Sequence, residues 1–472
     1  MSIRNRHIPL VFGGITNWSL ARRQLIMAAD TRHAAADPCP RSHAMHAAVR
    51  DPRHTPLVHA NFAPFLLAAF WMIPCLLPAG EPGPVVVVPA SPVTLEVAVP
   101  LAEAVKPDGA GRWQLVEVDH PNVVVPVQPV PALAPDGSPD QAARRLVAAV
   151  PPREGADGPR RFTLQTAGTD PGDASAGFRV EDIDEKSLGL WDGPSPVLVY
   201  NHGTVTAEHV PETDARRTRA CYVHPVYGLG GEVLTEDFPR DHYHHHGIFW
   251  TWPHVKIDDQ EYDLWADRGI KQRFVGWLAK EAGPLAGVIG VENGWFVGDR
   301  KVMIERVWLR AYKPSGDSRS LDLEFTWIPV DRPITLWGAG GKSYGGLTVR
   351  FAPPSGKDPS TVITVPDGPT TADLPDTPLA WADFTSKFGD HPRESGAAVF
   401  VPPSHPEYPP TWLTRHYGPL CVGWPGVTAK TFEPGVPIRL SYRIWIHKDA
   451  VETAKIQQAY DAYAEALKVA CE

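Results

Sequence analysis

Residues 319–328 read RSLDLEFTWI, and this stretch decides the fold class because apolar and polar residues alternate along it. Side chains of a β-strand point to opposite faces in turn, so Leu321, Leu323, Phe325 and Trp327 share one face and Asp322, Glu324 and Thr326 the other. Residues 438–447, IRLSYRIWIH, repeat the pattern with Ile438, Leu440, Tyr442, Ile444 and Ile446 inside and Arg439, Ser441, Arg443, Trp445 and His447 outside. The alternation predicts antiparallel sheets with one buried and one wet face.

The rest of the chain also favours a mostly β protein. Its 51 prolines and 40 glycines favour many turns and short strands over long helices. Short β-branched runs separated by Pro, Gly and Asp predict an N-terminal β-sandwich-like module over residues 81–200, with surface loops between residues 129 and 159. Residues 201–472 are predicted to form a larger antiparallel β super-sandwich.

Only the C-terminus carries a helical pattern. Apolar side chains three or four residues apart (Ile456, Tyr460, Tyr463 and Leu467) form one stripe, and Asp449 precedes them as a potential N-cap. We therefore expect a helix over residues 449–470.

Charge and the first 80 residues restrict partners and location. The net charge of -9 and the lack of a Lys/Arg-rich run exclude a phosphate-backbone partner, so no nucleic acid is expected. The apolar block at residues 62–79 is shorter than the ~20 residues that span a bilayer and contains three prolines, which favours a signal-peptide h-region. We expect an over-extended start, translation from Met45, cleavage near 79–80, and export to the periplasm or beyond, with no membrane span in the mature chain. An uncleaved anchor is the alternative.

Three cysteines beyond residue 80 (Cys221, Cys421 and Cys471) are too few for a disulfide framework, and none has CxxC spacing.

The densest group of ionisable side chains lies in residues 231–252, GEVLTEDFPRDHYHHHGIFWTW. Histidine exchanges protons near neutrality and is the commonest metal ligand. The candidate catalytic residues are His242, His244 and His245 as proton carriers, with Glu232, Asp237 or Asp241 as the carboxylate partner.

Two other interpretations of the histidine block stay open. If the strand at residues 247–252 extends backward, His242, His244 and His246 share one face and could hold a divalent metal with a carboxylate. The cofactor is therefore either none or a divalent metal. In the plainer interpretation, the histidines form a solvated or hydrogen-bonded cluster without chemistry.

Candidate substrate-binding residues flank the block. Arg216 lies in a charged segment and has the guanidinium fork that binds carboxylates or sugar hydroxyls. Lys342, Tyr344 and Arg350 lie in the glycine-rich stretch GGKSYGGLTVRF. That stretch lacks the spaced GxxxxGK[ST] pattern of a phosphate loop.

The segment HPVYGLGGEVLTEDFPRDHYHHHGIFWTW (224–252), with RACYV before it and KSYGGLTVRF after it, resembles a bacterial family of unknown function often labelled methane oxygenase PmoA. The shared motif positions are Gly231, Glu232, Asp237, Asp241, His242, His244, His245 and Gly247, whereas His246 stands where that family often has Arg or Lys. The resemblance covers roughly residues 85–465 and implies an exported β-rich protein.

The methane oxygenase label does not fit this chain. That label belongs to an integral membrane protein, and a chain with one short apolar block cannot cross a bilayer repeatedly. The resemblance instead implies a galactose-mutarotase-like super-sandwich, whose members act on sugars with a His acid and a carboxylate base. We therefore expect an exported carbohydrate-active enzyme of epimerase, lyase or hydrolase type with a carbohydrate or other small-molecule substrate. The alternatives are a non-catalytic glycan-binding or envelope protein and a metal-dependent oxygenase.

Overall fold

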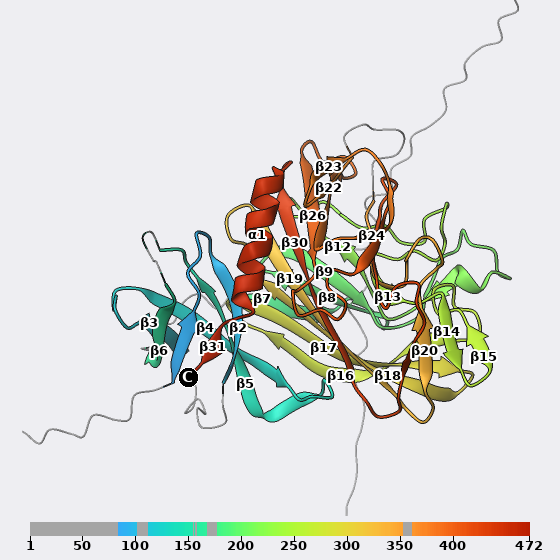
Figure 1. Cartoon of the computed structure of the whole chain (residues 1–472), viewed down its shortest axis with the longest axis horizontal. Coiled ribbons are helices and arrows are strands. Elements are labelled where there is room, and N and C mark those ends of the chain that lie inside the picture. The colour runs from blue at the N-terminus through green and yellow to red at the C-terminus, as the bar shows by residue number, and fades with distance from the viewer. Residues whose placement is uncertain (1–83, 102–111, 154, 156–157, 168–176, 353–360) are drawn as a thin grey trace, which may run out of the picture. The chain divides into compact units, whose positions relative to one another are not determined.

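The computed structural model describes residues 84–101, 112–153, 155, 158–167, 177–352 and 361–472 (Figure 1). The expected signal peptide lies outside these residues. Within them the chain is mostly β, with antiparallel sheets and one C-terminal α-helix, as the alternating sequence patterns predict. None of the described helices has the length and apolar run needed to cross a bilayer.

The N-terminal region forms a seven-stranded antiparallel sheet. Its strands, in spatial order, are β2 (Leu95–Leu101), β5 (Pro139–Val150), β4 (Val124–Leu133), β3 (Arg112–Glu117), β6 (Arg160–Ala167), β1 (Val85–Val88) and β31 (Ala470–Cys471). The edge strands β2 and β31 contact each other, so the sheet curls around its own apolar core. The last residues of the chain therefore complete the N-terminal sheet.

The prediction of loops between residues 129 and 159 is wrong, because this stretch contains the end of β4 and all of β5. Leu146, Ala148 and Val150 bury one face of β5 in the core of the curled sheet. The free energy gained by this burial outweighs the tendency of the nearby prolines and glycines to form loops.

Two nine-stranded antiparallel sheets form the larger region. The first has the order β24 (Leu374–Pro378), β27 (Thr411–Thr414), β28 (Pro419–Gly423), β21 (Gly346–Arg350), β13 (Ile248–Thr251), β12 (Tyr222–Val226), β9 (Ser195–Asn201), β8 (Ser187–Asp192) and β7 (Phe178–Asp182). The second has the order β16 (Lys271–Ala282), β17 (Ala286–Val297), β18 (Arg300–Tyr312), β19 (Ser318–Pro329), β30 (Ile438–Lys448), β26 (Glu394–Phe400), β25 (Trp381–Lys387), β22 (Val362–Val365) and β23 (Gly368–Thr370). The domain boundary expected at residue 200 stays a prediction, and β7, β8 and β9 pair into the first of these sheets.

Smaller elements complete the structure. A four-stranded sheet has the order β15 (Gln260–Tyr262), β14 (His254–Ile257), β20 (Ile334–Trp337) and β29 (Lys430–Phe432), and β10 (Val205–Thr206) pairs with β11 (Thr218–Arg219). One 3-10 turn spans Ala215–Arg217, and the helix α1 spans Thr453–Ala466.

The main core lies between the two nine-stranded sheets and confirms the predicted inward faces. Leu321, Leu323, Phe325 and Trp327 of β19 and Ile438, Leu440, Tyr442, Ile444 and Ile446 of β30 all belong to it. Residues two apart along each strand therefore meet the opposite sheet, as a sandwich requires.

The opposite face of β19 and β30 is mostly covered, with Arg439 as its exposed residue, which corrects the expectation of a fully solvated face. Asp322 and Arg443 are less than 10% exposed because they pair with each other under the N-terminal sheet. Trp445 packs with Ile456 and Tyr460 of α1, and α1 also contacts β2 (Figure 1). A strand pattern shows that a face is polar, but it does not show that the polar groups are paired beneath another element.

The helix is shorter than predicted. It begins at Thr453, and Asp449 instead has a positive φ of 56° and pairs with Arg393. Ile456, Tyr460 and Tyr463 are buried as expected, whereas Leu467 caps the C-terminus and is exposed.

Candidate functional site

The histidines lie in a compact turn rather than in an extended strand. The His242 amide donates to the Pro239 carbonyl (3.0 Å), and the His245 amide donates to the His242 carbonyl (2.9 Å). An antiparallel bridge between Asp237 and His246 closes the loop, and β13 begins only at Ile248. The predicted extended segment is therefore wrong. We call residues 237–246 the histidine turn.

The strand β21 holds the histidine turn in place. The Glu236 amide donates to the Arg350 carbonyl (3.0 Å), and the Arg350 amide donates to the Gly247 carbonyl (2.7 Å). A Cβ at Gly247 would lie 2.1 Å from the Val223 carbonyl oxygen, so no larger residue fits between β12 and the turn. The backbone thus fixes where the imidazoles emerge.

Three rings form a column on the outer side of the turn. His242 stacks on His245 with a centroid distance of 4.7 Å, and on its other face it stacks on Tyr417 at 5.1 Å. The Nδ1 atom of His242 lies 3.0 Å from Asp241 Oδ2, and both side chains are partly exposed (35% and 46%). The structure therefore brings one predicted imidazole close to one predicted carboxylate at a partly exposed place, while the Nδ1 atom itself is buried and is not aligned for a hydrogen bond.

Arg350 ties this cluster together. Its guanidinium donates to Glu236 Oε2 (2.9 Å), to Asp241 Oδ1 (3.2 Å) and to His245 Nδ1 (3.3 Å). Because a guanidinium only donates, His245 accepts at Nδ1 and carries its proton on Nε2. Partial burial raises the pKa of Asp241, but His242 and the Arg350 charge outweigh it, so the pKa is lowered and the carboxylate stays ionised.

His244 stands beside the column as a neutral imidazole. Burial, with the nearby His242 and the positive charge of Arg216, lowers the pKa of His244 to about 3. Its ring lies 4.8 Å from His245 and 6.2 Å from Trp265, and among the described residues no side chain or backbone group hydrogen-bonds to it. At neutral pH this ring therefore offers both a donor and an acceptor nitrogen.

His246 and Asp237 form a second, inner group. The imidazole Nδ1 of His246 donates to Asp237 Oδ1 (2.7 Å), and the Tyr222 hydroxyl donates to Asp237 Oδ2 (2.7 Å). Burial lowers the pKa of His246 to about 4 against the opposing effect of Asp237, so the ring donates as a neutral imidazole. Asp237, Tyr222 and His224 line an open pocket of ≈ 640 Å³.

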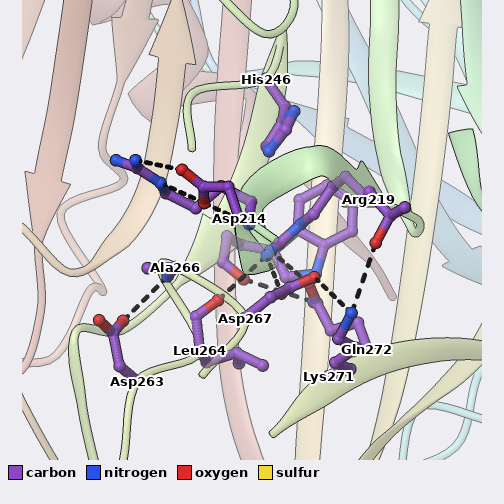
Figure 2. A network of polar contacts seen from close by, with 12 residues as sticks. Asp214, Arg219, His246, Asp263, Leu264, Ala266, Asp267, Lys271 and Gln272 are labelled. Atoms are coloured by element: carbon purple, nitrogen blue, oxygen red, sulfur yellow. Dashed lines mark hydrogen bonds and ion pairs between the residues drawn. The ribbon is translucent and has the colours of Figure 1, made fainter. Parts of the chain in front are cut away.

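A buried polar network supports the inner group (Figure 2). Arg219 donates to Asp267 Oδ1 (2.6 Å) and to Gln272 Oε1 (2.7 Å), and its charge acts on His246. Gln272 donates in turn to Glu305 (2.9 Å). The terminal nitrogens of Arg219 and the Gln272 side chain are paired in this way, whereas the buried Nε of Arg219 has no hydrogen-bond partner among the described residues. The network reaches His246 through the Arg219 charge alone.

Four predicted residues lie outside both the outer cluster and the inner group. Glu232 packs over Gly228, where a Cβ would lie 2.0 Å from its Oε1, and no contact joins it to the histidines. Arg216 is held by Asp214 (2.8 and 2.5 Å) and reaches His244 only through its charge. Tyr344 packs on Trp265 with a centroid distance of 4.7 Å, and Lys342 is an exposed turn residue.

The sequence analysis missed Tyr417, Trp265 and Glu236 as members of the site. Glu236 lies inside the motif between two residues that we did select, so its position was the available signal. Tyr417 and Trp265 come from distant loops, and a lone aromatic residue is far more often part of the core.

The metal-site alternative receives no geometric support. Within the described ranges, no group of three or more His, Cys, Asp or Glu side chains has an arrangement suited to a metal ion. The predicted set of His242, His244 and His246 is divided, because His246 turns inward to Asp237.

Comparison with known proteins identifies the family. The model described as "Family of unknown function (DUF6807)" matches residues 190–461, more than half of the chain. The chain belongs to this DUF6807 family. The DUF6807 match includes the whole histidine turn and β21, and its description assigns no activity.

No curated protein matches the chain. Among solved structures, a putative kojibiose phosphorylase from the human microbiome is similar at 7% identity and a TM-score of 0.26, covering 62% of this chain and 35% of that chain. The match thus spans about a third of that enzyme, and a likeness at this score carries no argument about activity.

Proposed function

We propose that the protein is an exported carbohydrate-active enzyme that transfers protons at the histidine turn. The observation that supports this proposal is the His242–Asp241 contact of 3.0 Å beside the unpaired His244. An imidazole facing an ionised carboxylate can accept and return a proton, which epimerisation, elimination and glycoside hydrolysis all require.

Each outer residue receives a role in this proposal. His242 carries the proton, and Asp241 stabilises the charge that develops on it. His244 stays neutral at pH 7 and hydrogen-bonds a sugar hydroxyl or carbonyl, because the lowered pKa removes it as an imidazolium acid. Arg350 is a positioning residue, since Glu236, Asp241 and His245 already occupy its guanidinium.

The exposed ring of Tyr417 favours a sugar over a smaller substrate. It is 38% exposed and carries His242 against one face, so a pyranose that stacks nearby brings its hydroxyls to the imidazoles. A galactose-mutarotase-like activity remains the form that the sequence resemblance suggests.

The test is turnover of soluble sugars in D₂O, followed by NMR. The purified chain is incubated with a panel of reducing monosaccharides, uronates and disaccharides, and the rate of anomer interconversion, solvent deuterium incorporation at carbon and bond cleavage are recorded. The wild type should act on at least one sugar, and His242→Ala should reduce the rate by about 10²-fold or more. No turnover on the whole panel, or equal rates in His242→Ala, would contradict the proposal.

The same variants separate the alternatives. His242→Ala should lose turnover and keep sugar affinity if the turn is catalytic, and His244→Ala should weaken sugar affinity as well, whereas a glycan-binding protein binds without turnover in every variant. Metal analysis with and without chelator tests the oxygenase alternative, since an oxygenase would lose activity when its metal is removed.

A further inference from the structure

A cavity of ≈ 450 Å³ lined by charged and apolar side chains lies where the N-terminal sheet and α1 cover the outer face of β18, β19 and β30, whereas the histidine turn is attached to β21 in the other nine-stranded sheet. Glu96 and Arg145 come from the N-terminal sheet, Arg310 and Asp322 from β18 and β19, and Tyr463 from α1. Ligand sites often form where two layers meet, and cavities of about 300–1,000 Å³ accept small molecules.

The walls of this cavity are fixed before any ligand arrives. Arg443 donates to Asp322 through Nε (2.6 Å) and Nη2 (3.0 Å), and it lies between the rings of Tyr312 (5.2 Å) and Tyr463 (4.7 Å). The Tyr312 hydroxyl also donates to Asp322 (2.7 Å). Side chains held this firmly lose little entropy when they bind.

Two polar groups in the cavity keep unused hydrogen-bonding capacity. Glu324 accepts at Oε1 from Arg145 (2.5 Å) and Arg310 (3.0 Å), while no described residue donates to its Oε2. Arg310 uses Nε and Nη2, and its Nη1 has no acceptor among the described residues. One hydroxyl can accept from a guanidinium and donate to a carboxylate, so these two atoms suit a polyol.

The charge balance argues against a charged ligand. Three arginines (Arg145, Arg310 and Arg443) face four carboxyl groups (Glu96, Asp140, Asp322 and Glu324). Burial raises the pKa of Glu96, which moves that group toward its neutral form. A net charge brought into nearly balanced surroundings gains little and still loses its hydration.

Two further cavities share residues with the first. One of ≈ 450 Å³ shares Glu96 and Arg443, and another of ≈ 200 Å³ shares Leu133, Glu324 and Ser441. The three cavities therefore adjoin the same side chains, and a ligand of more than one sugar unit would reach from one into the next past these shared residues.

We propose that this interface cavity is a binding site for a neutral oligosaccharide, separate from the histidine turn. Guanidinium and carboxylate groups bind the hydroxyls, and Leu133 and the exposed Leu467 contact the C–H faces. The site does not depend on the function proposed for the histidine turn.

The test uses the full chain with maltose and cellobiose as neutral probes and digalacturonic acid as a charged probe, measured by calorimetry. Ala143→Trp fills the cavity from β5, and the neighbouring Ala142→Trp places the same ring on the exposed side of the strand. Ala143→Trp should weaken binding of the neutral probes by about tenfold or more, while Ala142→Trp binds like the wild type.

Glu324→Gln provides a second variant with almost unchanged volume in case the tryptophan disturbs folding. It should weaken binding several-fold, because the free carboxylate oxygen becomes an amide donor. The proposal fails if neither neutral probe binds, if digalacturonic acid binds more tightly than both, or if Ala143→Trp and Glu324→Gln bind as the wild type does.

Discussion

Asp241 in the histidine turn and Glu305 in the core are both carboxylates among aromatic rings, but their surroundings are opposite. Glu305 is fully buried and accepts from Trp295 (2.7 Å), Trp327 (2.8 Å), Asn293 (2.9 Å) and Gln272. Asp241 is 46% exposed, and its oxygens face only the Arg350 guanidinium and the His242 ring. Saturated hydrogen bonding marks a structural group, and exposed, incomplete pairing marks a group that can meet a substrate.

The largest expected effect concerns stability at Glu305. Glu305→Gln places an amide donor against four existing donors, so the free energy of unfolding should fall by about 3–5 kcal/mol. Asp241→Asn is the matched control and should cost less than about 1 kcal/mol. Urea denaturation of both variants measures the difference, and similar losses would remove the contrast between the two regions.

Asp241, whose replacement should cost little stability, should have a large effect on activity. Asp241→Asn should lower kcat/KM by about 100-fold, because the imidazole of His242 loses the charge that faces it. Glu236→Gln is the control, since Glu236 also binds Arg350 but does not contact His242. Equal losses in both variants would assign the effect to Arg350 and its positioning of the turn.

Acid should destabilise the inner group. The pKa of His246 falls from 6.5 in the unfolded chain to about 4 in the folded protein, so between these values the unfolded chain binds more protons. Stability should therefore drop as the pH falls from 6.5 to 4, by on the order of 3 kcal/mol for this group. His246→Asn keeps a donor to Asp237 but cannot titrate, and its melting temperature should depend less on pH. An unchanged slope would show that other groups control acid sensitivity.

The smallest effect concerns the Tyr222 hydroxyl. Tyr222→Phe removes one hydrogen bond to Asp237 and should reduce the free energy of unfolding by about 1 kcal/mol. Tyr344→Phe serves as the control, because no described residue hydrogen-bonds to the Tyr344 hydroxyl, and it should cost less than about 0.5 kcal/mol. Thermal unfolding of the two variants gives the comparison.

The sequence predicted what depends on local pattern. The alternation in residues 319–328 and 438–447 gave the buried faces correctly, and residues 247–252 gave the strand β13. The covered outer face escaped prediction because the pairing of Asp322 with Arg443 depends on elements more than 100 residues apart in sequence.

In the candidate site, too, contacts between sequence neighbours were predictable and contacts between distant segments were not. His242 and Asp241 are neighbours in sequence, so their contact was predictable, whereas the inward rotation of His246 depends on the turn at Pro239 and the bridge to Asp237. Tyr417 reaches His242 from a different loop, and nothing in its local sequence indicates this. Long-range packing decides which of the histidines in the turn keeps an imidazole without a hydrogen-bond partner among the described residues.

The most direct test of the account is the protonation of His244, followed by ¹⁵N chemical shifts of its ring nitrogens from pH 8 to pH 4. The structure predicts a neutral imidazole throughout, because its pKa is lowered to about 3. Protonation of His244 near pH 6.5 would show a solvated side chain and would contradict a histidine turn built to keep a neutral ring for a substrate.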